Sequence, residues 1–115
     1  MKNNKIADLP KLVRDDIPRL IAESGKKYKS HIADSIEFPK RLKEKMMEEV
    51  QELYHNPSLS EAADVYEVFL SMMKIFKFDL DDVVMVANHK RDIAGSFTRA
   101  IILDNVIDIG EQKNG

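Results

Sequence analysis

The sequence predicts a mostly α-helical domain, and three observations carry that prediction. Four segments, at about 16–24, 37–54, 59–76 and 80–93, space their apolar residues at the three- and four-residue intervals of amphipathic helices. Proline and glycine fall near the ends of these segments rather than in their middles. A hydrophobic content of 43% with 33% charged residues is typical of a globular chain rather than a disordered or membrane-spanning one.

The length and composition set further bounds. A chain of 115 residues suits one domain, predicted over 1–115. The longest apolar runs are far too short to cross a bilayer, and MKNNKIADLP at the N-terminus lacks an apolar signal core, so we expect a cytoplasmic protein without membrane contact. The absence of cysteine excludes disulfides and thiolate chemistry. A net charge of −2 gives no general attraction to nucleic acid, which we do not expect as a partner.

The first and last predicted helices have clear ends. Pro18 suits the first turn of the helix that starts at about 16, and Gly25 closes it. Asp79 is a plausible cap for the helix over 80–93, which Gly95 ends. Between and after the helices, 26–33 lacks helical periodicity and 99–109 is rich in β-branched residues, so the two segments are candidates for a small two-stranded accessory ribbon.

The two central helices carry most of the information. Asn56-Pro57 interrupts them with a connection of about five residues, which makes the helices antiparallel neighbours and predicts a helical hairpin as the core. The predicted apolar faces of the two helices consist of Phe38, Leu42, Met46, Val50 and Leu53 on the first and Val65, Val68, Phe69, Met72 and Phe76 on the second. Glu49 and Glu61 fall within these faces, and Glu52 and Asp64 lie just beside them. Glu52 and Glu61 are equally distant from the turn, and so are Glu49 and Asp64. The four carboxylates are therefore expected within about one helical turn of each other.

Four ionised carboxylates turned toward one apolar interface would repel one another and resist desolvation. A hard divalent cation with oxygen ligands is the simplest compensation, and Mg²⁺ commonly combines carboxylates with substrate phosphates. A plainer interpretation stays open for Glu61, because Ser58-x-x-Glu61 matches a capping box in which Glu61 folds back onto the helix start. Glu44 and Lys45 are expected on a solvated face.

A phosphate ligand at such a metal would also need cations from the protein. Lys90 falls on the same stripe of its helix as Val83, Ala87 and Ala94. A lysine in that position either extends past the core to water or reaches toward acids and phosphates, and we favour the second role. The methionines at helical spacing predict core or oligomer contacts, and they fit a homodimer.

The motifs resemble a known superfamily. Glu48-Glu49-x-x-Glu52 followed by Glu61-x-x-Asp64 is similar to the motif pair of the MazG-like all-α nucleoside triphosphate pyrophosphohydrolases. KLVRDDIPRLI at 11–21 and KRDIAGSFTRAIIL at 90–103 resemble the end motifs of a branch of predicted house-cleaning pyrophosphatases, also labelled phosphoribosyl-ATP pyrophosphohydrolase-like, so the resemblance covers about 11–103. Asp16 stands where a basic residue is expected, and Ser96 replaces the second glycine of Gly-Gly-Phe.

The resemblance implies a four-helix, MazG-like arrangement and a Mg²⁺-dependent hydrolase, with Mn²⁺ as a substitute. The expected reaction converts a nucleoside triphosphate, with a non-canonical nucleotide as the expected substrate, to the monophosphate and pyrophosphate. Carried over, the metal ligands would be Glu49, Glu52, Glu61 and Asp64. Glu48 would orient water, and Glu49 or Glu52 would take the proton. The candidate phosphate-binding residues are Lys11, Arg14, Lys90, Arg91 and Arg99.

Three alternatives remain open at this stage. Phosphoribosyl-ATP hydrolysis shares the chemistry but needs a different substrate pocket. A helical interaction module would use the acids in salt bridges with Lys43, Lys45 or a partner. A degenerate relative would bind nucleotide without hydrolysing it. Members of the MazG-like superfamily are generally oligomeric, so the resemblance also implies a homo-oligomer.

Overall fold

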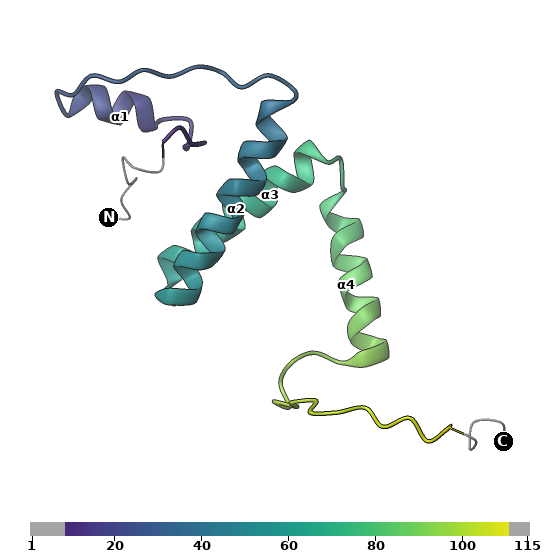
Figure 1. Cartoon of the computed structure of the whole chain (residues 1–115). Coiled ribbons are helices and arrows are strands. Elements are labelled where there is room, and N and C mark those ends of the chain that lie inside the picture. Colours follow the sequence, from purple (N-terminus) through teal and green to yellow (C-terminus); the bar gives the residue numbers. More distant parts are fainter. Residues whose placement is uncertain (1–8, 111–115) are drawn as a thin grey trace. The chain divides into compact units, whose positions relative to one another are not determined.

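The computed structural model describes residues 9–110, and within them the chain forms four α-helices, as predicted (Figure 1). Their bounds are α1 Ile17–Glu23, α2 Glu37–His55, α3 Leu59–Ile75 and α4 Leu80–Ala94. The chain divides into two compact units, Met1–Leu80 and Asp81–Gly115. The interpretation of 1–115 as a single domain stays a prediction.

The suggested accessory ribbon does not form. Neither 26–33 nor 99–109 is a strand, and no strand occurs anywhere between residues 9 and 110. A strand exists only through hydrogen bonds to a neighbouring strand. The β-branched composition of 99–109 and the lack of helical periodicity in 26–33 therefore overestimated their tendency to form strands.

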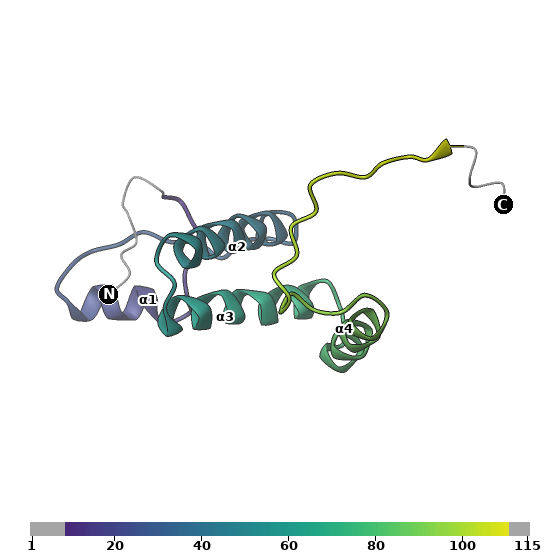
Figure 2. The same ribbon diagram turned by 90° about the horizontal axis from the view of Figure 1, so that it is seen from below.

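The first unit is built on the hairpin of α2 and α3. The two helices lie side by side in both views, joined by the short link 56–58 (Figures 1 and 2). Leu42 on α2 and Val68 on α3 are its most buried apolar side chains, with 2% and 8% of their surface exposed. Several predicted core residues surround them half-buried: Phe38, Met46, Leu53, Val65, Phe69, Met72 and Phe76.

The inward face of α2 is rotated slightly from its predicted direction. Val50, expected within the apolar arc, is 47% exposed, whereas the preceding residue Glu49 is only 3% exposed. Adjacent helical residues point about 100° apart, so a small rotation exchanges their environments. Glu49, predicted on the face that closes the hairpin, is therefore buried there, whereas Val50 is turned toward solvent.

Side chains near the helix starts satisfy backbone N–H groups that have no partner inside the helix. Asp34 Oδ1 accepts hydrogen bonds from the backbone N–H groups of Ile36 and Glu37, at 3.0 and 2.8 Å. Ser58 is the N-cap of α3, and its Oγ accepts from the Glu61 N–H at 3.2 Å. Just after the C-terminal end of α1, Gly25 has a φ of 87°, a conformation that favours glycine.

The second unit consists of α4 and the chain that follows it. None of the α4 residues is buried, and residues 101–109 contain no helix or strand. The large apolar side chains in this unit that are about half exposed or more are Val84, Met85, Val86, Ile93, Phe97, Ile101, Ile102, Leu103, Val106, Ile107 and Ile109. Within residues 9–110, none of the helices is both long and apolar enough to cross a membrane.

Candidate metal site and its cationic neighbours

Three carboxylates meet where α2 and α3 face each other. Oxygens of Glu49, Glu61 and Asp64 all lie within 4.8 Å of one another. Glu49 and Glu61 are 3% and 7% exposed, and the Asp64 side chain is 21% exposed. Glu49 comes from the last half of α2 and the other two from the first turns of α3, so the short link between the helices brings them together.

The position of Glu61 bears on the two roles predicted for it. Its backbone N–H donates to Ser58 Oγ, so the predicted cap exists at the main chain. One oxygen of its carboxylate lies in the group with Glu49 and Asp64. Ser58 therefore holds the start of α3 through the backbone, while the Glu61 side chain takes part in the acid cluster.

Basic side chains contact two of these acids directly. Lys45 Nζ lies 3.4 Å from Glu49 Oε2, and Arg14 Nη2 lies 2.8 Å from Asp64 Oδ1. Isolated carboxylates resist transfer from water into a protein interior, and a nearby cation reduces that cost. The protein thus balances part of the acidic charge with its own basic residues.

Lys45 does not occupy the solvated position predicted for it. Its side chain is only 11% exposed, and besides Glu49 it reaches Glu48 Oε1 at 3.2 Å. The signal was present in the sequence, because residues three and four positions apart share one face of a helix. Glu44 does behave as expected: its side chain is 53% exposed and pairs with Arg41 at 3.2 Å.

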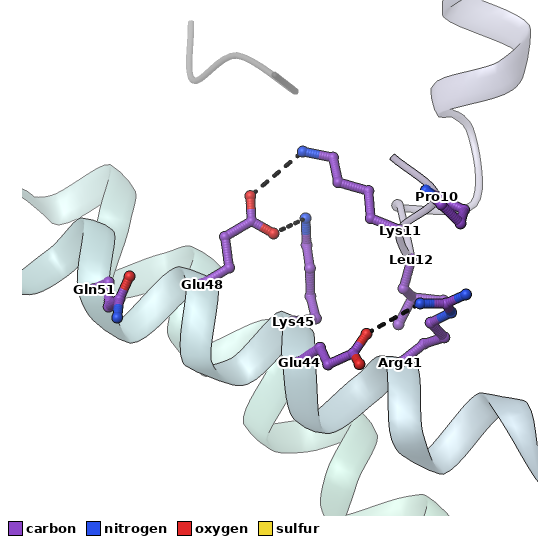
Figure 3. A pocket seen from close by; sticks show the side chains of 8 residues that line it. All are labelled: Pro10, Lys11, Leu12, Arg41, Glu44, Lys45, Glu48 and Gln51. Carbon is purple, nitrogen blue, oxygen red and sulfur yellow. Dashed lines mark hydrogen bonds and ion pairs between the residues drawn. The ribbon is translucent and has the colours of Figure 1, made fainter. Parts of the chain in front are cut away.

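A cleft of about 280 Å³ opens between the chain at 10–12 and the outer side of α2 (Figure 3). The Lys11 and Lys45 side chains converge on the carboxylate of Glu48, which Lys11 Nζ approaches at 3.4 Å. Lys11 is even less exposed than Lys45, at 8% of its side-chain surface. The residues that line the cleft are Pro10, Lys11, Leu12, Arg41, Glu44, Lys45, Glu48 and Gln51.

The two lysines also set the charge of Glu48. Partial burial is the largest single influence on its pKa and raises it, since a low-polarity environment disfavours the charged form. The combined attraction and hydrogen bonds of Lys45 and Lys11 outweigh that effect and hold the pKa of Glu48 below its ordinary value. Glu48 is therefore ionised at neutral pH.

The remaining candidates from the sequence are Glu52 on α2 and three basic residues of the second unit. Glu52 is half-buried on α2, lies outside the group of three acids, and makes no side-chain hydrogen bond or ion pair within residues 9–110. Lys90, Arg91 and Arg99 are exposed residues of the second unit. Arg91 Nη1 donates to Asn88 Oδ1 at 2.6 Å. The roles proposed for these four residues stay predictions, whereas Lys11 and Arg14 lie beside the acids.

The donor set of the cluster fits a hard divalent cation. Mg²⁺, Mn²⁺ and Ca²⁺ prefer oxygen ligands and particularly carboxylates, and all three clustered groups supply them. Mg²⁺ usually keeps several waters and takes only a few protein ligands. A set of three carboxylates, one of them partly exposed, suits that preference.

Comparisons of the chain with models of known families, with curated proteins and with solved structures find no match. The resemblance to the MazG-like superfamily therefore rests on the motifs of this sequence.

Proposed function

We propose that this protein is a Mg²⁺-dependent nucleoside triphosphate pyrophosphohydrolase that releases pyrophosphate and a nucleoside monophosphate. The observation that supports this most is the meeting of Glu49, Glu61 and Asp64, three of the four acids of the motif, at one place between α2 and α3. Their predicted proximity depended on the hairpin, which the chain forms. We expect a non-canonical nucleotide as the substrate and Mn²⁺ as a working substitute.

In this proposal, Glu49, Glu61 and Asp64 hold the metal, and Glu52, one helical turn beyond Glu49, is the expected fourth ligand. When bound, Mg²⁺ neutralises phosphate oxygens and lowers the pKa of water. Glu48 is ionised and partly exposed, so it can accept a hydrogen bond from the attacking water and orient it.

Basic residues near the acids complete the proposed site. Arg14 is paired with Asp64, yet 55% of its side chain is exposed to solvent. A guanidinium in that position can bind phosphate oxygens through two parallel hydrogen bonds. Lys11 lies on the other flank, at Glu48. Lys90, Arg91 and Arg99 remain proposed phosphate contacts on the basis of the resembling motif.

A second candidate is a non-enzymatic helical module, and specific contacts favour it. The pairs Lys45–Glu49 and Arg14–Asp64 are the kind of salt bridge that such a module would use to neutralise its acids. Lys43, named for the same role, instead places its Nζ 5.5 Å from the centre of the Phe76 ring. Under this alternative the acids serve folding, and divalent cations have no effect on the protein.

We also propose that the chain acts as a homo-oligomer. The exposed apolar side chains of the second unit, such as Phe97 and Ile102, exceed what isolated surface residues normally show. Sedimentation over a range of concentrations tests this, with assembly beyond one chain expected. A single 13.2 kDa species at every concentration would contradict it.

A pyrophosphate-release assay over canonical, deoxy and damaged nucleoside triphosphates, with and without Mg²⁺, tests the enzymatic proposal. Phosphoribosyl-ATP belongs in the panel, because preferred turnover of that compound would select the histidine-synthesis alternative. We expect Glu49→Gln to lower the rate by more than about 100-fold, since losing even an outer partner of a metal site costs up to about that factor.

The matched control is Glu67→Gln, the same substitution at an exposed position of α3. It is expected to leave turnover unchanged. No Mg²⁺-dependent release from any compound in the panel would reject the enzymatic proposal, and equal activity in Glu49→Gln would reject the assigned site.

A further inference from the structure

We propose that the cleft between the chain at 10–12 and α2 binds a phosphate group of the substrate, with Lys11 and Lys45 as its anion-binding pair. This inference rests on the proposed function and adds a binding site and the residue Lys45 to it. Its starting point is the unusual burial of the two lysines, whose side chains are 8% and 11% exposed.

Lysine is seldom buried to this extent unless it has a partner. Glu48 accepts from both lysines, at 3.4 Å from Lys11 and 3.2 Å from Lys45. Glu49 is the second carboxylate near Lys45, at 3.4 Å. The two ammonium groups of the cleft are thus balanced by two carboxylates, of which one belongs to the acid cluster.

This sharing connects the cleft to the metal site. A divalent cation held by Glu49 uses the carboxylate that Lys45 contacts, and the positive charges of the cation and the ammonium group repel each other. Of the two carboxylates that contact the lysines, Glu48 alone would then be left to balance both ammonium groups. An anion in the cleft restores the balance, so anion binding there is expected to require the metal.

The other charged groups that line the cleft, Arg41 and Glu44, pair with each other and leave the expected link between metal and anion binding unchanged. Arg41 adds a third basic side chain to the lining, and Glu44 adds a second acid beside Glu48. Arg41 is already engaged by Glu37 and Glu44, at 3.1 and 3.2 Å. Lys11 and Lys45 are therefore the groups whose balance changes when Glu49 takes up a metal.

The size of the cleft narrows the class of ligand. Its volume of about 280 Å³ is at the lower end of the range for ligand sites. Such a space accommodates a pyrophosphate group more readily than a whole nucleoside triphosphate. We therefore assign the cleft to the phosphate end of the substrate, with the nucleoside lying outside it.

Calorimetric titration with inorganic pyrophosphate, with and without excess Mg²⁺, tests this site without any turnover. With Mg²⁺ present, Lys45→Met is expected to weaken pyrophosphate binding roughly tenfold to a hundredfold, as for loss of a charged hydrogen bond. Without Mg²⁺, the difference between Lys45→Met and the native protein is expected to disappear. Lys40→Met, at an exposed position of α2, is the control and is expected to bind like the native protein.

Two further variants keep the test decisive. Lys45→Arg preserves the charge and should retain most of the binding, whereas a purely structural role for the lysine chain would not predict such rescue. If Lys45→Met does not fold, Lys11→Met removes the other ammonium group of the pair and should give the same loss.

The outcomes separate this inference from the proposed function. Unchanged pyrophosphate affinity in Lys45→Met and Lys11→Met overturns the cleft, even in a protein that hydrolyses triphosphates normally. A difference that persists without Mg²⁺ overturns the link between the cleft and the metal. Weakened binding in a protein that hydrolyses no triphosphate supports the cleft and rejects the enzymatic proposal.

Discussion

The α2–α3 hairpin and the unit formed by residues 81–110 distribute their side chains in opposite ways. In the hairpin, the four side chains with the least exposure include two acids, Glu49 and Glu61, beside the apolar Leu42 and Val68. In the second unit, no residue of α4 is buried, and Phe97 and Ile102 are 101% and 79% exposed. One region buries charge, and the other exposes apolar surface.

Both arrangements cost free energy in an isolated chain, since buried acids resist desolvation and exposed apolar groups order water. Our proposals assign a binding role to each feature. The acids of the hairpin are proposed to hold a divalent cation, and the apolar side chains of the second unit are proposed to contact a second copy of the chain.

The comparison predicts its largest effect at the core of the hairpin. Leu42→Ala should lower the free energy of unfolding by about 2–5 kcal/mol, because it leaves a cavity at a fully buried site. Ile102→Ala should change it by less than about 0.5 kcal/mol when the chain is dilute enough to be a single copy. Denaturant titration of both variants measures the difference.

If Ile102→Ala lowers the free energy of unfolding of the dilute protein about as much as Leu42→Ala does, the contrast between the two regions is wrong. That result would mean that the second unit buries this side chain within one chain, and it would remove Ile102 from the argument for an oligomer.

A smaller effect is expected at the start of α2, as a function of pH. Hydrogen bonds from the backbone N–H groups of Glu37 and Ile36 hold the pKa of Asp34 below its ordinary value of 3.8. A carboxyl group with a lowered pKa stabilises the folded protein above its ordinary pKa, and that contribution is lost as the pH falls through the lowered value. Asp34→Ala should therefore reduce the melting temperature at neutral pH and progressively less below about pH 4.

Thermal melts of both proteins across this pH range provide the measurement. Asp104→Ala in the second unit is the control, because Asp104 is exposed, and its removal should have little effect at any pH. If the difference in melting temperature between Asp34→Ala and the native protein is the same at every pH, the role assigned to the Asp34 carboxylate is contradicted.

Local patterns predicted the helices well because the signals that end them are local. The predicted spans for α2 and α3 agree with the observed ones to within one residue, and the short link between them was enough to bring Glu49 close to Asp64 and Glu61. Apolar periodicity and turn residues act over a few positions, so a single sequence contains them.

The parts that could not be predicted depend on longer-range contacts or on flexible side chains. Lys11 meets Glu48 and Arg14 meets Asp64 across 37 and 50 residues, and no local spacing encodes those pairs. Lys45 looked solvated because its position was judged by direction alone, yet a long side chain can turn its charged end back along the helix. The cleft follows from these same contacts, so it was not foreseen either.

The central claim is that Glu49, Glu61 and Asp64 bind a divalent cation, and thermal unfolding at increasing Mg²⁺ concentration tests it most directly. A cation that binds only the folded protein stabilises it by about 2.7 kcal/mol at a hundred times its dissociation constant. The melting temperature of the native protein should therefore rise with Mg²⁺. In Glu61→Gln the rise should be largely lost, and in Glu67→Gln it should be retained. A melting temperature that does not respond to Mg²⁺ or Mn²⁺, or an equal response in Glu61→Gln, would contradict the claim.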